Sequence, residues 1–327
     1  MNRPATFWLI AFIITALTAY YQRVSGPTYA MSGTVTFRGK ELAYTLDRSH
    51  GGPTNAVVRI PVNDSSIHGV IEWKRYKTND EWTQTAMIDS AGVLTAELPH
   101  QPPAGKLLYR VVLDDQVEKI VLPETDPVVI RFKGDVPLAV LIPHILAMFG
   151  AMLLSARAGL EVFSTTPKFK SLIQWTMAFF FVGGIILGPI VQKYAFDAFW
   201  TGWPFGSDLT DNKTAVALLA WGIAAIGIRR SQRPKRWVLG AAFVTFIVFL
   251  IPHSMFGSEL DYNSPTKQPT GLNIIRPRPD NWVAKPSEGL CWVIQTSRRN
   301  DLRKLSAHKN LLYLGKWRFE SFRKFTV

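Results

Sequence analysis

The chain has 327 residues, of which 47% are hydrophobic and 19% are charged. Soluble globular proteins carry about 25% charged residues, so this composition predicts that part of the chain does not face water. Glycine and proline contents are ordinary and there is a single cysteine, which excludes a collagen-like chain, a wholly disordered chain and a scaffold of internal disulfides.

The net charge of +13 is concentrated in one part of the chain. Residues 263–327 hold thirteen Lys and Arg against four acidic residues, a net +9. This segment shows no clear helical or strand periodicity and no run long enough for a membrane span. It is therefore predicted to be a basic, poorly folded C-terminal extension, and no nucleic-acid partner is expected from its charge.

Five apolar segments are predicted to span a lipid bilayer, because about twenty apolar residues are needed to cross roughly 30 Å of hydrocarbon. They cover residues 7–21, 136–156, 172–191, 209–228 and 237–257. The first lacks a small-residue cleavage site, so it is interpreted as an uncleaved anchor rather than a signal peptide. The fourth is long enough only if its helix begins at Leu209, with Asp208 as the N-cap and Asp211 in the acid-favouring first turn.

The charges of the connecting segments predict the orientation. Residues 229–236 contain five cations and no acidic residue, and the positive-inside rule places such a loop in the cytoplasm. Residues 157–170 and the N-terminus then lie on the same side. Residues 26–135 and the loop 192–212 are predicted to lie outside, at the outer face of a bacterial cytoplasmic (inner) membrane.

The segment between the first two spans is predicted to be a β-sandwich. Residues 26–135 contain about nine short runs of alternating character, with turn signals such as Gly51-Gly-Pro53 every eight to twelve residues. The stretch Leu98-Pro-His-Gln-Pro-Pro-Ala-Gly-Lys-Leu-Leu-Tyr-Arg110 resembles the approach to a late strand in immunoglobulin-like and fibronectin type III-like domains. The resemblance implies a fold and no particular activity.

The predicted fold is therefore a membrane α-helical bundle of five transmembrane helices plus an all-β immunoglobulin-like sandwich domain. Its parts are an N-terminal transmembrane anchor (1–25), an extracytoplasmic β-sandwich (26–135), a four-helix membrane module (136–262) and the basic extension (263–327). The lipid bilayer is the first partner that this organisation implies.

Two histidines inside the predicted spans are the first candidates for chemistry, because an ionisable residue within a bilayer is costly to bury. Each follows a proline in the same tetrapeptide, Leu141-Ile-Pro-His144 and Leu250-Ile-Pro-His253. Imidazole is a common ligand of metal ions and of haem iron, so the pair could hold a haem b or join a metal site. The acidic residues that could complete a metal site are Asp208, Asp211, Glu259 and Asp261. Alternatively, each imidazole could bond a carbonyl group of a neighbouring helix and be structural.

The outer loop between the third and fourth spans is dense in aromatic, glycine and acidic residues. The residues singled out in it are Asp197, Trp200, Trp203 and Gly206. Tryptophans at this position are typical of the aromatic belt at headgroup level, whereas Gly202, Pro204 and Gly206 favour a particular loop shape. The loop is interpreted either as part of the belt or as a lid over an outward-facing polar site.

Two stretches of this region resemble a group of known proteins. Phe199-Trp-Thr-Gly-Trp-Pro-Phe-Gly206 followed by Asp208-Leu-Thr-Asp-Asn-Lys213, and Ile251-Pro-His-Ser-Met-Phe-Gly-Ser-Glu-Leu-Asp-Tyr262, are similar to uncharacterised bacterial multipass membrane proteins. The resemblance covers about residues 136–262. It implies a shared membrane module with an outward-facing polar face and carries no activity.

Two functions are compatible with these predictions. In the first, the outward-facing polar site near the membrane surface binds a metal ion or haem and serves a redox or electron-transfer role. In the second, the protein is a non-enzymatic envelope interaction or assembly factor that binds an envelope protein through its β-sandwich. The sequence does not decide whether the protein is an enzyme. A transporter is less favoured, because the spans show no internal repeat and little intramembrane charge.

Overall fold

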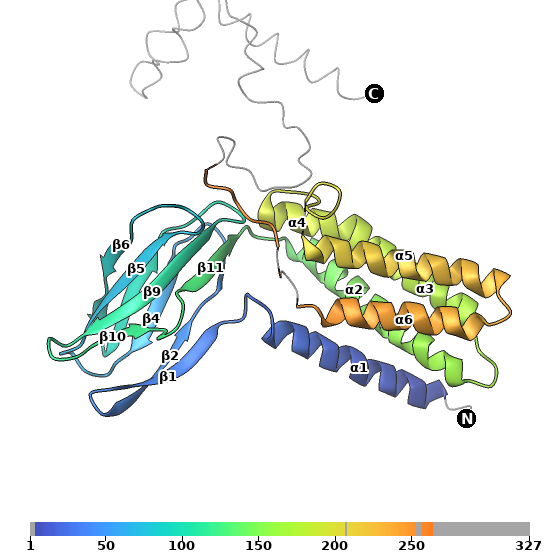
Figure 1. Cartoon of the computed structure of the whole chain (residues 1–327), viewed down its shortest axis with the longest axis horizontal. Helices are drawn as coiled ribbons and strands as arrows, with labels where there is room; N and C mark the ends of the chain where they lie inside the picture. The colour runs from blue at the N-terminus through green and yellow to red at the C-terminus, as the bar shows by residue number, and fades with distance from the viewer. Residues whose placement is uncertain (1–3, 207, 253–254, 256, 264–327) are drawn as a thin grey trace, which may run out of the picture. The chain divides into compact units, whose positions relative to one another are not determined.

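The computed structural model describes residues 4–206, 208–252, 255 and 257–263. Figure 1 shows these residues as a set of helices and a β region. The prediction of membrane-length helices combined with a β region is confirmed at this level. The predicted extension lies outside the described residues apart from Asn263, and so does His253.

The β region contains eleven strands among the described residues, where the sequence showed about nine alternating runs. The strands are β1 (Met31–Phe37), β2 (Lys40–Leu46), β3 (Ser49–Gly51), β4 (Ala56–Pro61), β5 (His68–Arg75), β6 (Thr83–Ala86), β7 (Ile88–Ser90), β8 (Val93–Leu98), β9 (Lys106–Asp114), β10 (Lys119–Leu122) and β11 (Val128–Lys133). β3 and β7 have three residues each, which is too short for alternation to reveal them.

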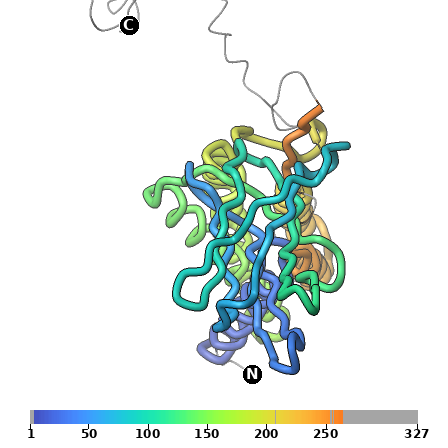
Figure 2. Tube along the Cα trace, turned by 90° about the vertical axis from the view of Figure 1, so that its left-hand side faces the viewer, coloured from blue at the N-terminus to red at the C-terminus, as the bar shows by residue number. Residues whose placement is uncertain are grey.

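These strands form three sheets. The largest has the order β3-β11-β9-β5-β6, with β10 also paired with β9, and a second has the order β4-β8-β7. β1 and β2 pair only with each other in the third. The pairs of described strands are antiparallel except for β3 with β11, which is parallel. Figure 2 turns the β region toward the viewer and traces its strands in blue to green.

Alternation along the strands builds one apolar core between the two larger sheets, because successive side chains of a strand point to opposite faces. The core combines Leu107, Tyr109 and Val111 of β9 with Ile60 of β4 and Leu94 of β8, and each of these side chains is almost fully buried. The inner faces of the two sheets therefore lie opposite one another. The other face of β9 carries polar residues such as Arg110, which form part of the surface described below.

The helices flank the β region in the sequence. α1 (Pro4–Val24) precedes it, and α2 (Leu138–Leu160), the 3-10 turn η1 (Glu161–Phe163), α3 (Phe169–Phe180), the π-helix η2 (Phe181–Leu187), α4 (Gly188–Phe196), α5 (Leu209–Arg230) and α6 (Pro234–Leu250) follow it. Three helical stretches of the described chain are long and apolar enough to cross a membrane: Pro4–Val24, Leu138–Phe163 and Phe169–Phe196. They include most or all of the first three predicted spans and indicate a membrane protein.

α5 begins where the sequence predicts. The Asp208 side chain accepts a hydrogen bond from the Thr210 N–H at 2.8 Å, so the predicted helix start and N-cap are confirmed. α5 packs on α6 through Trp221, which is fully buried and donates its indole N–H to the Thr245 hydroxyl at 2.9 Å.

α6 ends at Leu250, whereas the sequence predicted a span that continues to Gly257. Ile251 has extended backbone, with φ −69° and ψ 123°. It precedes Pro252, and the proline ring disfavours helical backbone at the residue before it. The fifth helix therefore ends before Pro252, and the predicted span is shorter as a helix than the sequence indicated.

Candidate functional site

The carboxylate of Asp208 lies at the centre of a buried polar cluster at the start of α5. Its Oδ2 accepts hydrogen bonds from the Ser258 N–H at 3.0 Å, the Ser258 hydroxyl at 3.2 Å and the Thr201 hydroxyl at 3.1 Å. Asp208 is 6% exposed and Thr201 is 2% exposed. One side chain thus joins the loop before α5 to the segment after α6.

Asp211 and Gln192 complete this cluster. Oδ2 of Asp211 accepts the N–H groups of Thr201 at 2.7 Å and of Gly202 at 3.0 Å. The amide of Gln192 donates to the Thr201 hydroxyl in a short contact and lies 3.5 Å from Ser258 Oγ. We call Gln192, Thr201, Asp208, Asp211 and Ser258 the junction cluster. Each of its side chains is hydrogen-bonded within the protein.

Two glycines allow the loop to approach the cluster this closely. A Cβ atom on Gly202 would lie 2.6 Å from Cβ of Asp211, and one on Gly206 would lie 2.3 Å from the Thr201 carbonyl oxygen. The Gly206 N–H donates to the Gly202 carbonyl at 2.9 Å and closes the turn. The particular loop shape that the glycines predicted therefore reflects a close backbone approach, which only glycine permits.

Arg131 brings a buried cation from β11 to the cluster. Its Nη2 donates to the Ser258 carbonyl at 2.5 Å, and its guanidinium carbon lies 3.8 Å from the centre of the Phe196 ring. Burial lowers the pKa of this guanidinium to about 10, although the carboxylates of Asp208 and Glu259 act in the opposite direction. No described residue accepts a hydrogen bond from its Nε.

Lys213 of α5 supplies a second buried cation. Its Nζ donates to the carbonyl groups of Ile251 at 2.9 Å and Pro252 at 3.4 Å, just after the end of α6. Arg131 and Lys213 both interact electrostatically with the Asp208 carboxylate and offset its negative charge. Charges buried in such a balanced, hydrogen-bonded arrangement avoid the large cost of an isolated buried ion.

Residues 257–263, which we call the strap, continue from the junction cluster to the β region. The N–H of Leu260 donates to the Ala104 carbonyl at 3.1 Å. Glu259 forms ion pairs with Lys106 at 2.8 Å and Lys77 at 2.9 Å. These contacts fix the strap along the ends of β5 and β9.

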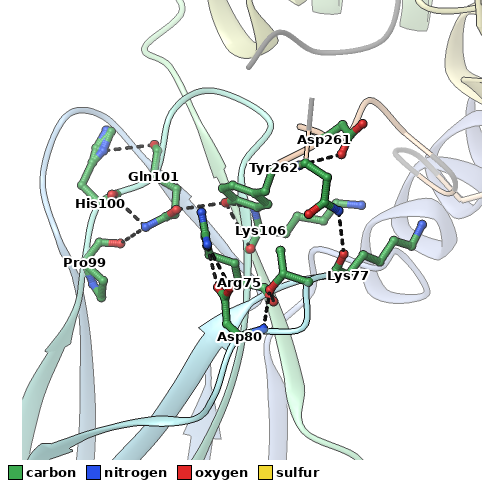
Figure 3. A network of polar contacts seen from close by, with 11 residues as sticks. Arg75, Lys77, Asp80, Pro99, His100, Gln101, Lys106, Asp261 and Tyr262 are labelled. Carbon is green, nitrogen blue, oxygen red and sulfur yellow. Dashed lines mark hydrogen bonds and ion pairs between the residues drawn. The ribbon is translucent and has the colours of Figure 1, made fainter. Parts of the chain in front are cut away.

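Tyr262 anchors the far end of the strap. Its hydroxyl accepts the Lys106 N–H at 3.0 Å and donates to the Gln101 side-chain oxygen at 3.0 Å. The Arg75 guanidinium, which is paired with Asp80 at 2.5 Å, lies 5.4 Å from the centre of the Tyr262 ring. Figure 3 shows these side chains gathered around the ring.

The protonation of the strap contacts follows from their surroundings. Burial lowers the pKa of Lys106, while its hydrogen bond and attraction to Glu259 oppose this. Burial acts to raise the pKa of Glu259, but the hydrogen bonds and charges of Lys106 and Lys77 hold it below its usual value. Burial raises the pKa of Tyr262 to about 12. At neutral pH Glu259 is therefore ionised and Tyr262 is protonated.

The predicted ligand His144 contacts the backbone of the next helical stretch. Its Nδ1 lies 2.9 Å from the Gly183 carbonyl oxygen of the π-helix η2, and the same oxygen accepts the Gly188 N–H. This contact matches the structural interpretation of His144, a bond to a neighbouring carbonyl group. His253 is outside the described residues, so the pairing of the two histidines stays a prediction.

The predicted loop residues lie on both sides of the junction cluster. Asp197 ends α4 in the left-handed conformation, with φ 59°, and pairs with Lys193 at 2.6 Å. The indole N–H of Trp200 donates to the Trp203 carbonyl at 3.2 Å, and the Trp203 side chain is 78% exposed. The Trp203 N–H donates to Asn212 at 2.7 Å. The loop is thus held by the first turn of α5, with one tryptophan directed outward.

The carboxylates predicted as metal ligands divide into separate settings. Asp208 and Asp211 lie together, as predicted, but their carboxylate oxygens accept hydrogen bonds from hydroxyl and backbone N–H groups of the protein. Glu259 binds two lysines, and Asp261 accepts the Asn263 N–H at 2.9 Å. No group of three or more His, Cys, Asp or Glu within the described part of the chain is arranged to hold a metal ion.

Several residues of this site were not singled out from the sequence: Lys106, Arg131, Gln192, Thr201, Lys213, Ser258 and Tyr262. Thr201, Lys213, Ser258 and Tyr262 lie inside the stretches that carry the family resemblance. Arg131 and Gln192 have no such signal, because only the folded chain brings them to Ser258.

Comparisons with protein-family models, with curated proteins and with solved structures find no match for this chain.

Proposed function

We propose that this chain is a non-enzymatic interaction or assembly factor of the bacterial envelope, which binds a protein partner through its β region. The observation that carries the proposal is an ordered cation–aromatic surface on the outer face of the largest sheet. We call its residues Glu72, Lys74, Trp82, Gln84 and Arg110 the Trp82 face.

The Trp82 face is held together by its own contacts. Lys74 Nζ lies 5.2 Å and Arg110 Cζ lies 4.8 Å from the centre of the Trp82 ring, within the range of cation–π attraction. Arg110 also pairs with Glu72 at 2.6 Å, and Gln84 donates to the other Glu72 oxygen at 2.9 Å. Side chains ordered in this way lose little entropy when a partner binds.

The composition and place of the face suit a protein partner. Tryptophan and arginine are enriched at protein interfaces and dominate their binding energy. Trp82 directly precedes β6, which stands at the end of the strand order, and Gln84 in β6 is exposed. An edge strand also offers backbone groups to an extended partner segment.

The junction cluster and the strap support a binding role for the β region. Their carboxylates are engaged by Lys106 and Lys77 or by protein N–H and hydroxyl donors, rather than being directed at a substrate. These contacts attach the strap to the β region and leave the binding role to the Trp82 face.

The proposal includes the full predicted architecture: five spans, a cytoplasmic N-terminus, and an immunoglobulin-like sandwich outside the inner membrane. One contact supports a common direction for α1 and α6, since the Gln22 amide near the end of α1 donates to the Phe249 carbonyl near the end of α6. Both ends then lie on the side to which the strap leads, and the cationic loop 229–236 lies at the other end of α6.

Site-directed photocrosslinking in cells tests the proposal. A photoreactive amino acid at Gln84 of the full chain should give a discrete protein adduct on irradiation. The same residue at Glu41, which is exposed on β2 in a different sheet, is the control and should give none. Trp82→Ala in the Gln84 variant should remove the adduct without changing the amount of folded protein in the membrane.

An absent Gln84 adduct, an equal adduct from Glu41, or an adduct that survives Trp82→Ala would contradict a partner at this face. The redox alternative is tested by purifying the same chain and measuring its visible spectrum and metal content. A haem band in the visible spectrum or stoichiometric metal in the purified chain would support it over the interaction role.

A further inference from the structure

A groove of about 290 Å³ lies between α1, α2 and α6. Its walls include Thr15 and Thr18 of α1, Ala156 of α2, Phe163 of η1, and Leu239 and Phe246 of α6. Two of the three helical stretches that form it are long and apolar enough to cross a membrane. The surroundings of the groove are therefore hydrocarbon rather than water.

Contacts toward both ends of α1 bracket the groove. Toward the start of α1, the guanidinium carbon of Arg157 lies 5.3 Å from the ring centre of Phe7 and 5.6 Å from that of Trp8. Toward the end of α1, the Gln22 amide donates to the Phe249 carbonyl of α6. α1 is thus held near both ends and leaves a gap along its middle. The groove therefore results from the way in which α1 packs against α2 and α6.

The three threonine hydroxyl groups in the groove wall are hydrogen-bonded to carbonyl groups of their own helices. Thr15 and Thr18 donate to the carbonyl groups of Ala11 and Ile14 in their own helix, each at 2.8 Å. Thr245 donates to the Ala241 carbonyl at 2.9 Å in the same way. With their hydroxyl groups bonded in this way, the three threonines contribute mainly their methyl groups to the groove. The walls of the groove are therefore apolar although they contain threonine residues.

We propose that this groove binds one acyl chain of a bilayer phospholipid. One turn of a helix about 10 Å wide and 5.4 Å long takes up roughly 420 Å³, which is more than the groove volume of about 290 Å³. A single hydrocarbon chain fits the space. Because lipid offers no hydrophobic drive, the chain is held by close dispersion contacts with the walls. The proposal does not depend on the Trp82 face.

Photolabelling tests this in the full chain, reconstituted in phosphatidylcholine vesicles that contain a trace of phosphatidylcholine with a diazirine in one acyl chain. The expected result is label concentrated on the groove segments of α1, α2 and α6. Ala156→Phe, which fills the groove from α2, should lose most of that label. Ala215→Phe, on the exposed surface of α5, is the matched control and should keep it.

Leu239→Trp, from the α6 wall, is a second filling variant and protects the test if Ala156→Phe does not fold. Label spread evenly over lipid-exposed helices, or label unchanged in both folded filling variants, would overturn the proposal. In a variant with Ala156→Cys and Cys291→Ser, an oxidant-induced disulfide between two copies would also overturn it, because a second copy would then occupy the groove.

Discussion

Replacing Asp208 with asparagine is the most direct perturbation of the junction cluster. Asparagine has nearly the same shape, but it keeps one acceptor oxygen and presents an NH2 group in place of the other. If that oxygen stays on the Thr210 N–H, the NH2 group faces the Ser258 N–H, donor against donor. If the side chain turns over, α5 loses its N-cap.

The contacts of Asp208 set the size of the effect. A hydrogen bond to a charged group contributes about 1.5–3 kcal/mol, and a buried donor left unpaired costs about 1–3 kcal/mol. Loss of an N-cap costs about 1 kcal/mol. Arg131 also loses a nearby negative charge. We expect the free energy of unfolding to fall by about 2–4 kcal/mol, which corresponds to about 4–8 °C in midpoint temperature for a large chain.

Thermal unfolding of the full chain in one detergent, followed by tryptophan fluorescence, measures this shift. The matched control is Asp126→Asn, which removes a carboxylate from an exposed turn of the β region and should change the midpoint little. Equal midpoints for Asp208→Asn and the wild type would refute the argument, since the carboxylate would then contribute no more than a neutral amide.

Three further predictions concern the strap, the helix packing and the orientation. The pKa of Glu259 in the folded chain is held below its usual value. The stabilisation that Glu259 provides is therefore present above the pKa of the unfolded chain and is lost as the pH falls through the lower pKa of the folded chain. Glu259→Gln should lower the midpoint at pH 7, and the difference from the wild type should shrink in acid. A Cβ on Gly184 would lie 2.2 Å from Thr214 Cγ2, so Gly184→Ala should destabilise the chain by about 1–3 kcal/mol. Adding Thr214→Ala should recover part of this loss of stability. Strictly additive effects of the two substitutions would contradict the close packing. In a Cys291→Ser background, Ser231→Cys should react with a membrane-impermeant thiol reagent only from the cytoplasmic side. Ser66→Cys should react only from outside. Labelling of both cysteines from the same side would refute the orientation.

The start of α5 could be predicted because its cause is local. Asp208 caps the N–H of Thr210, which lies only two residues away in the chain. The end of α6 also had a local signal in Pro252. The apolar run that continues past Pro252 suggested a longer span. Hydrophobic side chains favour burial in the bilayer, but they do not remove the restriction on the backbone of the residue before a proline.

Arg131 shows why the site as a whole could not be predicted. Val128, Ile130 and Phe132 of β11 face the apolar core, so alternation places Arg131 on the opposite, solvent side. The structure instead leaves Arg131 only 6% exposed. Phe196 lies against its guanidinium, and Ser258 accepts its hydrogen bond. Neither partner can be inferred from the strand itself.

His144 shows a related limit. The sequence placed it inside a span and left open whether it binds a ligand or a neighbouring carbonyl group. The outcome depends on the rotation of α2 about its axis and on the π-helix that presents the Gly183 carbonyl oxygen. Both are set by packing between helices, which a single sequence does not encode as a local pattern.

The junction cluster and the strap meet at two adjacent residues, and this makes a final prediction. Ser258 binds Asp208 through its N–H and hydroxyl and Arg131 through its carbonyl. The next residue, Glu259, binds Lys106 and Lys77. If Asp208→Asn releases Ser258, Glu259 loses the anchor that positions it, and the reverse holds for Glu259→Gln. The double substitution should therefore cost less than the sum of the two single ones, as expected for groups in one network. Additive losses in midpoint temperature would show instead that the start of α5 and the attachment of the strap to the β region are independent.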